Sequence, residues 1–157
     1  MQTDGGDLPL PESLLRVAPF VMLQLVRAGR RLAERMPAGA RLPQVAVLAC
    51  LEEFGPQSQR EVGRRLRFDP SDMVRIVDLL ERDGHVARRR DPDDRRRYAL
   101  APTAAGRRWL GERLDAIESR PVLLAGLDEA ERERLLQLLV KALAHVDGRV
   151  PQESRAV

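Results

Sequence analysis

Two arginine triplets, at positions 88–90 and 95–97, flank the acidic segment Asp91-Pro92-Asp93-Asp94. Guanidinium groups donate hydrogen bonds to phosphates and enter narrow grooves, so the chemistry they offer is recognition of a polyanion. Between Arg64 and Arg97, eleven arginines accompany eight acids, and this excess of three equals the net charge of the whole chain, +3. The interleaved acids also fit a solvated, salt-bridged surface, so the charge pattern alone leaves both interpretations open.

No set of residues in the sequence is typical of an enzyme. The two histidines, His85 and His145, lie far apart and near no carboxylate or cysteine at ligand spacing. Metal-ligand, phosphate-loop and nucleophile motifs are missing from the sequence, so we expect no catalytic residue, metal or cofactor. A nuclease metal site at Asp91, Asp93 and Asp94 can be imagined, but six flanking arginines favour a role in shaping the turn and pairing with arginine.

Cys50 is the only cysteine, so no disulfide can form within the chain and a reducing compartment is expected. We interpret its thiol as buried and inert because no basic neighbour in the sequence would lower its pKa. A thiol-based redox regulator acting through Cys50 is the alternative. The first residues are polar and acidic, unlike a signal peptide, and no apolar run reaches the roughly 18 residues of a membrane span. The expected location is cytoplasmic, without membrane contact.

Composition favours one mainly helical domain. The 157 residues are 43% hydrophobic and 32% charged, and Ala, Leu, Arg and Glu dominate. Aromatic residues make up only 3%, which argues against a β-sandwich and against a platform for base stacking.

The segment 58–82 predicts two short helices. Ser58 and Glu61 form the pattern of a capping box for a helix over 59–66. After a brief connection, Asp69 is expected to cap a second helix that begins at Pro70 and ends near Arg82. Helices joined by so few residues form a helix-turn-helix. In the second helix, the residues expected to face the core are Met73, Ile76, Val77 and Leu80, and those expected to face outward are Ser71, Asp72, Arg75, Asp78 and Leu79. The outward face suits a DNA groove, and an ordinary surface helix is the alternative.

A β-hairpin is expected next. Gly84 ends the second helix in the left-handed conformation, a strand over 85–88 follows, and residues 97–101 form its return. The tip between these strands holds the arginine triplets and the three aspartates. Such a charged hairpin is a wing.

Apolar helices flank these elements. Pro19 places the start of the first long helix near Ala18, with residues 12–17 as a separate turn or a kinked extension, and a helix over 43–53 begins with Pro43. Thr103 is expected to cap a helix to about Ser119, and residues 128–131 repeat the capping-box pattern before a last helix that ends at Gly148. The residues expected to be buried are Val45, Val47, Leu48 and Leu51 in the 43–53 helix, and Trp109, Leu110, Leu114 and Ile117 after Thr103. The apolar stripe of the last helix is wider than one neighbour needs, which predicts burial against a second copy of the chain.

This order of elements resembles the MarR family (multiple-antibiotic-resistance regulators) of winged helix-turn-helix transcription factors over about residues 14–146. The most specific stretch is DPDDRRRYALAPTAAGR. In it, Asp94-Arg95-Arg96 matches the family's Asp-x-Arg wing motif, Pro102-Thr103 stands in place of Leu-Thr, and Gly106 fills the glycine position. LLERDGHVAR resembles the family's helix end and strand start.

The resemblance implies a mainly α fold with a small β-hairpin wing, in which a winged helix-turn-helix is flanked by dimerisation helices. The expected organisation is an arm at 1–13, one domain at 14–148 and a tail at 149–157. Within the domain, helices over 14–36 and 104–147 hold the dimer, and residues 43–102 form the DNA-binding lobe.

The resemblance also implies a homodimer that binds a palindromic operator in double-stranded DNA, as a repressor or less often an activator. Arg96 would enter the minor groove, Asp94 would hold the wing, and Ser71, Asp72 and Arg75 would line the recognition helix. The candidate DNA-binding set is completed by Arg88, Arg95 and Arg97. A small phenolic or lipophilic effector is implied as well, although no motif marks its pocket. Asp72 and Val74 stand where the family more often has small hydroxyl residues, so no base preference is carried over.

A winged-helix module that binds protein instead of DNA is the rival interpretation. The interleaved acids and the nearly neutral remainder of the chain support it. The two interpretations differ in whether sequence-specific DNA binding occurs.

Overall fold

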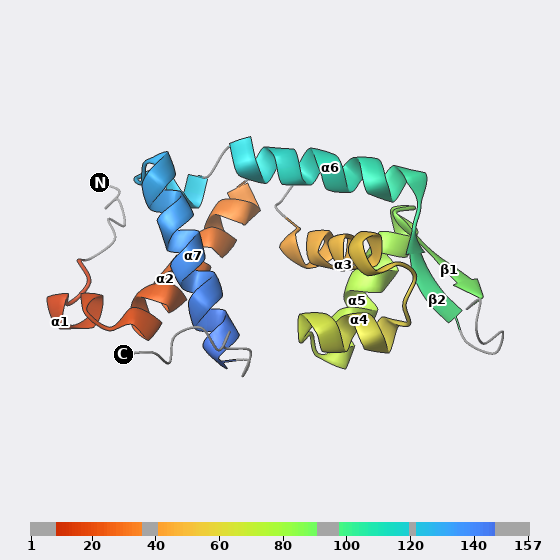
Figure 1. Cartoon of the computed structure of the whole chain (residues 1–157), viewed down its shortest axis with the longest axis horizontal. Coiled ribbons are helices and arrows are strands. Elements are labelled where there is room, and N and C mark those ends of the chain that lie inside the picture. The colour runs from red at the N-terminus through yellow and green to blue at the C-terminus, as the bar shows by residue number, and fades with distance from the viewer. Residues whose placement is uncertain (1–8, 36–40, 91–97, 120–121, 147–157) are drawn as a thin grey trace, which may run out of the picture. The chain divides into compact units, whose positions relative to one another are not determined.

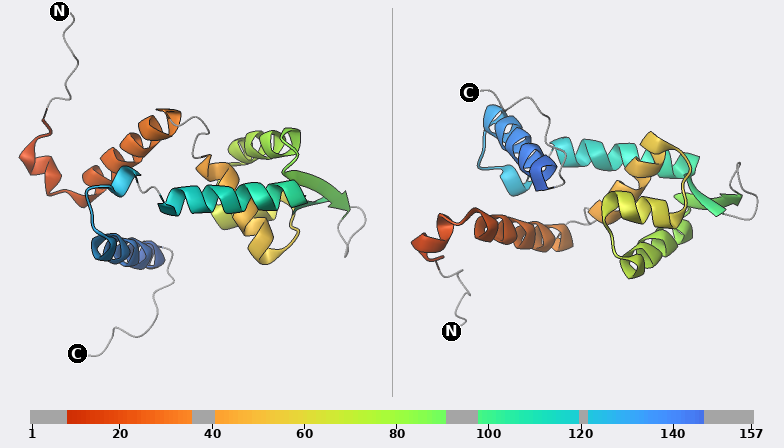
Figure 2. Two further views of the ribbon diagram at one scale, coloured as in Figure 1. Left: turned by 90° about the horizontal axis from the view of Figure 1, so that it is seen from above. Right: turned by 60° about the horizontal axis from the view of Figure 1, so that its bottom comes forward.

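The computed structural model describes residues 9–35, 41–90, 98–119 and 122–146 (Figures 1 and 2). The elements in chain order are α1 (Glu12–Leu15), α2 (Ala18–Arg35), α3 (Leu42–Phe54), α4 (Gln59–Leu66), α5 (Pro70–Arg82), β1 (Val86–Arg90), β2 (Tyr98–Pro102), α6 (Ala104–Ser119), the 3-10 helix η1 (Val122–Leu124) and α7 (Glu129–Val146). The chain divides into two compact units, residues 1–120 and 121–157. The predicted fold class, mainly α with one β-hairpin wing, is confirmed.

Elements α3, α4, α5, β1, β2 and α6 form what we call the winged lobe. One apolar core joins them, because α5 turns its predicted inner face toward α3 while the hairpin and α6 close the remaining sides. The core residues include Val47, Leu48 and Leu51 of α3, Val62 of α4, Met73, Ile76, Val77 and Leu80 of α5, Val86 and Leu100 of the hairpin, and Leu110 of α6. All four residues predicted to face inward from α5, and all four from α3, are buried.

Helices α4 and α5 form the helix-turn-helix. The predicted capping box is present: Ser58 Oγ accepts a hydrogen bond from the Glu61 amide at 3.3 Å, and a Glu61 carboxylate oxygen accepts one from the Ser58 amide at 2.9 Å. The turn is tight because Arg67 adopts a left-handed conformation, with φ 57°. Asp69 occupies the N-cap position of α5, but its side chain makes no capping hydrogen bond, so the predicted capping role of that carboxylate is wrong.

The hairpin is antiparallel, with Val86 opposite Pro102 and Arg90 opposite Tyr98. Strand β1 begins one residue later than predicted and ends two residues later, and β2 is described from Tyr98 and ends one residue later than predicted. The backbone of Gln57, just before α4, exchanges hydrogen bonds with Leu100 of β2 at 2.8 and 3.3 Å. The hairpin is therefore attached directly to the start of the helix-turn-helix. Residues 91–97 lie outside the described residues.

Four residues, Gly84, His85, Thr103 and Gly106, form what we call the junction. Gly84 ends α5 with φ 72°, as predicted. Thr103 then donates its hydroxyl to the Gly84 carbonyl at 2.7 Å and its amide to the His85 carbonyl at 3.0 Å, and its Oγ1 accepts the Gly106 amide at 3.0 Å. These bonds join the end of α5, the base of the hairpin and the first turn of α6, and they confirm Thr103 as the predicted cap.

The flanking helices agree with most of the expectations. Helix α2 begins at Ala18 after the separate short helix α1, whereas α3 begins one residue before Pro43. Leu110 is buried in α6, but Leu114 and Ile117 are 40% and 37% exposed, so their predicted burial is wrong within this chain. The core of the lobe is covered by the first half of α6, and the second half extends past it.

Helix α7 belongs to the second unit. The predicted capping box is present, because Asp128 accepts the Glu131 amide and Glu131 accepts the Asp128 amide, both at 2.9 Å. No residue of α7 is buried within this unit, and Leu136, Leu138, Leu139, Val140 and Leu143 are exposed. None of the described helices combines the length and hydropathy that crossing a bilayer requires.

Gly106→Ala should lower the free energy of unfolding by about 3 kcal/mol, because a Cβ at this position would lie 2.0 Å from the His85 carbonyl oxygen. Gly111→Ala is the matched control, since a Cβ there meets nothing within 4 Å on the same helix. The control should gain up to about 1 kcal/mol from helix propensity. Urea unfolding followed by circular dichroism measures both, and equal effects of the two substitutions would contradict the close contact at the junction.

Candidate nucleic-acid interface

The outward face of α5 carries three of the candidate residues. Ser71, Asp72 and Arg75 are all exposed. They lie on the side of α5 opposite its buried core residues, because the helical repeat of 3.6 residues places the exposed and the buried positions on different faces. Val74 lies on the same open side and is 50% exposed. Leu79 is also expected to point outward, but its side chain is half-buried. The helix thus presents a polar face that no other described element covers.

Asp72 and Arg75 form an ion pair one helical turn apart, with 2.9 Å between Arg75 Nη2 and an Asp72 carboxylate oxygen. The two side chains are 52% and 75% exposed, so the pair adds little stability. Its effect is local: it directs the guanidinium along the outer face of the helix. The Asp72 carboxylate is therefore hydrogen-bonded to Arg75 and does not cap the helix.

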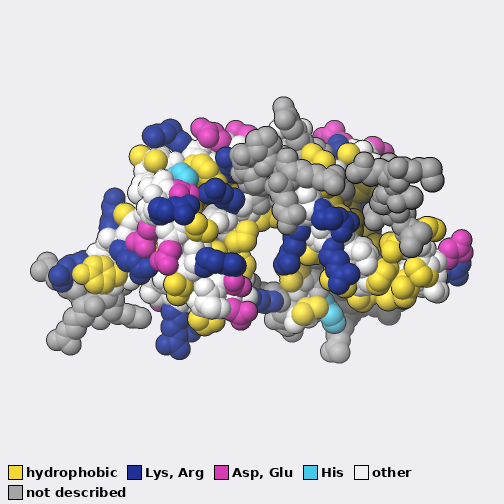
Figure 3. All heavy atoms as spheres, turned by 180° about the vertical axis from the view of Figure 1, so that it is seen from behind, with side chains coloured by type: hydrophobic (Ala, Val, Ile, Leu, Met, Phe, Trp, Pro, Cys, Tyr) yellow, Lys and Arg dark blue, Asp and Glu magenta, His cyan; other side chains and the backbone are white. Residues whose placement is uncertain are grey.

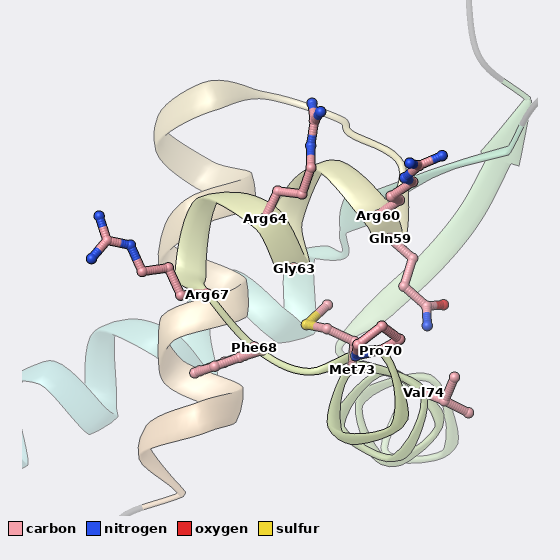
Figure 4. Close-up of a pocket in the computed structure, with 9 residues that line it drawn as sticks. All are labelled: Gln59, Arg60, Gly63, Arg64, Arg67, Phe68, Pro70, Met73 and Val74. Carbon is pink, nitrogen blue, oxygen red and sulfur yellow. The ribbon is translucent and has the colours of Figure 1, made fainter. Parts of the chain in front are cut away.

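Helix α4 contributes basic residues that the sequence analysis did not single out. Arg60, Arg64 and Arg67 border an open groove of about 720 Å³ between α4 and α5 (Figure 4). The floor of this groove is apolar and includes Phe68 and Met73. In Figure 4 the Arg64 side chain extends away from the groove toward solvent. The spacing of these arginines, four and three residues apart, is a helical pattern that could have revealed them.

The base of the wing is described as far as Arg90 and from Tyr98 onward. Arg88, a candidate DNA-binding residue, donates from Nε to both carboxylate oxygens of Glu81 at 3.0 and 3.1 Å, and from Nη2 to the Gln59 side-chain oxygen at 3.4 Å. The candidates of the wing tip, namely Asp94, Arg95, Arg96 and Arg97, lie outside the described residues.

On the face of the winged lobe seen at the left of Figure 3, magenta acidic side chains lie among the dark blue basic ones. Asp83, at the end of α5, pairs with Arg82 at 3.1 Å and with Arg41 at 2.8 Å. Hydrogen bonds from Arg82 and then Arg41 hold the pKa of the Asp83 carboxyl below its usual value. Arg41 precedes α3, so the Arg41–Asp83 pair joins the end of α5 to the start of α3.

Cys50 lies in the core of the lobe and is 4% exposed. Burial raises the pKa of its thiol, and the nearby charge of Arg65 only partly opposes this effect. A thiol that reacts with oxidants needs exposure and thiolate character, and the burial of Cys50 opposes both.

Comparison with known proteins assigns the winged lobe. A family model, described as "MarR family", matches residues 41–98, from the start of α3 to the start of β2. The uncharacterised HTH-type transcriptional regulator YkoM of Bacillus subtilis is 33% identical over 104 residues, which cover 65% of this chain and 67% of YkoM. The chain belongs to the MarR family.

Solved structures extend the MarR likeness over most of the chain. A probable transcriptional regulator from Pseudomonas aeruginosa is 32% identical, with a TM-score of 0.70 over 82% of this chain and 98% of that one. The PcaV transcriptional regulator from Streptomyces coelicolor, in complex with its natural ligand, is 29% identical, with a TM-score of 0.67 over 87% of this chain and 96% of that one. The chain spans 60% of the length of another relative, the uncharacterised HTH-type transcriptional regulator YcgE of Bacillus subtilis, to which it is 32% identical over 93 residues. This MarR-family chain is a transcriptional regulator and not an enzyme.

Cys50 should react with iodoacetamide at least about tenfold more slowly in the folded protein than in urea, because the thiol must wait for local opening of the core. Intact-mass measurement over time gives both rates, and Cys50→Ser, which cannot be alkylated there, sets the baseline. Equal rates in the folded and unfolded protein, or a rapid mass gain in dilute peroxide, would restore the redox-regulator interpretation.

Proposed function

We propose that this chain is a cytoplasmic, homodimeric repressor that binds a palindromic operator in double-stranded DNA. The observation that carries the proposal is the uncovered face of α5, which lies beside the arginines of α4 and above the base of a charged hairpin. A winged helix-turn-helix uses these three surfaces together: the recognition helix in a major groove, the preceding helix across the backbone, and the wing in an adjacent minor groove.

Within the recognition helix, Ser71, Asp72 and Arg75 are the proposed base-reading residues. Arg75 is the strongest candidate for guanine, because a guanidinium can donate two hydrogen bonds to its O6 and N7 atoms. Asp72 holds that guanidinium and offers an acceptor for a cytosine amino group. At the wing, Arg96 is proposed to enter the minor groove with Asp94 holding the tip, while Arg95 and Arg97 neutralise phosphates.

Arg60 and Arg64 are proposed as the phosphate contacts of α4. Both are exposed, and neither forms an ion pair with any residue that the structure describes, so their charge is available to DNA. Such contacts release counterions and add affinity without reading sequence. They complement the exposed face of α5, which carries acids as well as Arg75.

Dimerisation is supported by apolar surface that one chain leaves exposed. In α2 these residues include Met22, Leu23, Leu25 and Val26, and in α7 they include Leu136, Leu139, Val140 and Leu143. Exposure of large apolar side chains over whole helices is typical of surfaces that a second subunit covers. We propose one dimeric domain over residues 14–148, with helices at 14–36 and 104–147 holding the dimer around a lobe at 43–102.

Release by a small-molecule effector is the regulatory part of the proposal. It is supported by PcaV, the similar regulator whose structure contains its natural ligand. In a dimer, the distance between two recognition helices depends on the helices that join them, so a ligand between those helices changes the fit to DNA. A phenolic or lipophilic molecule is the proposed class.

Selection from a pool of random duplexes should enrich a palindrome whose half-sites are roughly 34–36 Å apart, one turn of DNA. Arg75→Ala should cost about 1–3 kcal/mol and relax the preference at one base position, whereas Arg64→Ala should weaken all duplexes alike and lower the salt slope by about one. Fluorescence anisotropy at several salt concentrations measures both. A pool that yields no enriched sequence would instead support the protein-binding module.

Leu143→Glu should shift the protein toward monomer and reduce operator affinity by at least about tenfold, because a carboxylate would have to be buried in the dimer. Leu143 is 58% exposed in the single chain, so the change leaves the chain's own core intact. Lys141→Gln alters the net charge by the same amount on the opposite face of α7 and should remain dimeric. Analytical ultracentrifugation decides, and a Leu143→Glu variant that remains dimeric would contradict the proposed role of α7.

A further inference from the structure

We infer that Glu81 and Gln59 are positioning residues, which hold the wing against the recognition helix through Arg88. On this inference Arg88 acts on DNA by placing the wing and not by touching phosphate. The inference rests on the proposed function, since it assigns roles within the same DNA-binding surface. It concerns the last turn of α5, the first residue of α4 and the middle of β1.

The contacts join three elements at one guanidinium. Arg88 Nε donates to both oxygens of the Glu81 carboxylate at 3.0 and 3.1 Å, and Arg88 Nη2 donates to Gln59 Oε1 at 3.4 Å. Glu81 lies in α5 and Gln59 begins α4, so the group connects the wing to both helices of the helix-turn-helix. Two of the three guanidinium nitrogens of Arg88 are thereby turned toward the protein.

Strand geometry explains why Arg88 faces the helices. Arg88 is paired with Leu100 across the hairpin, and directly opposed residues share a face of a sheet. Val86, two residues before Arg88 on the same face, and Leu100 both belong to the apolar core, so the Arg88 face is the one turned toward the core. The backbone pairing of Leu100 with Gln57 brings the start of α4 to this place.

Arg89 is the natural comparison within the same strand. It is paired with Ala99, on the opposite face from Arg88, because successive side chains alternate. Arg89 is exposed, and no ion pair joins it to any described residue. The two neighbours carry equal charge, but only Arg88 is bound to the recognition helix.

The side chains of Arg88 and Glu81 are 43% and 29% exposed, so water screens their attraction only in part. As a pair they carry no net charge, and they add no long-range attraction for DNA. Their contribution is geometric: β1 has left α5 only a few residues earlier, through the junction, and the pair prevents the hairpin from pivoting there.

The substitution Glu81→Gln separates placement from direct contact by the sign of its effect. It removes one acid and releases a guanidinium, so a phosphate-binding Arg88 would bind DNA more tightly in the variant. A positioning pair predicts the reverse: the operator palindrome from the random pool should bind about fivefold more weakly, while the unfolding temperature stays close to that of the wild-type protein because an exposed pair contributes little stability.

A second measurement reports the wing itself. Inosine–cytosine and guanine–cytosine pairs present the same major-groove edge, but guanine adds an amino group in the minor groove. Replacing inosine–cytosine by guanine–cytosine pairs beside each half-site adds this amino group to the minor groove and should displace the wing. The wild-type protein should then lose about tenfold in affinity. Glu81→Gln and Arg88→Ala should both reduce this penalty to less than about threefold, since their wing is no longer held.

Arg89→Ala is the control for charge. It removes the same charge as Arg88→Ala and should weaken every duplex with a smaller salt slope, yet keep the full minor-groove penalty. Three results would overturn the inference: unchanged or tighter operator binding by Glu81→Gln, a full penalty in Arg88→Ala, or the same loss of penalty in Arg89→Ala. If the wild-type protein selects no palindrome, the proposed function fails first and the inference falls with it.

Discussion

The close approach of α6 to the His85 carbonyl is the constraint on which the winged lobe depends. Only a residue without Cβ fits at Gly106, because an added Cβ would lie 2.0 Å from that carbonyl oxygen. The Thr103 hydroxyl donates to the Gly84 carbonyl and accepts the Gly106 amide, which caps α6, while the Thr103 backbone amide donates to the His85 carbonyl. The end of α5, the base of the hairpin and the first turn of α6 are therefore joined to one another at these four residues.

Two kinds of apolar surface follow from this arrangement. The surface inside the lobe is closed by the chain itself: α3 supplies the central helix, and α5, the hairpin and α6 cover it until Leu48, Val77 and Leu100 have almost no exposure. Helix α2, within the first unit, and helix α7, within the second, each carry large apolar side chains that their own unit leaves exposed. The lobe thus closes its own core within one chain, and the proposed dimer would remove the apolar side chains of the flanking helices from water.

The net charge of the winged lobe does not show which arginines are paired with a carboxylate and which are not. Many arginines of the lobe are already engaged: Arg75 by Asp72, Arg88 by Glu81, Arg107 by Glu52, and Arg41 by Asp83. These pairs join α6 to α3, the wing to α5, and the start of α3 to the end of α5. Acids that reduce the net charge therefore also connect elements of the lobe, and the proposed attraction for DNA rests on arginines that form no ion pair with a described carboxylate, such as Arg64.

Local sequence determined where most helices begin and end. The capping boxes at Ser58 and Asp128, the glycine that stops α5, the threonine before α6 and the buried face of α5 were all predictable, because each depends on a few neighbouring residues and on helical periodicity. The exposure of Leu114 and Ile117, the inward turn of Arg88 and the attachment of Asp72 to Arg75 instead of to the helix end were not. Those outcomes depend on which elements come together in three dimensions, and periodicity alone cannot say where a neighbour stops or which carboxylate reaches a guanidinium first. The sequence alone thus specified a winged helix-turn-helix with an arginine-rich wing, and the tertiary structure decided which arginines of the described residues pair with a carboxylate, because pairs such as Arg41–Asp83 and Arg107–Glu52 form between elements that are distant in the sequence.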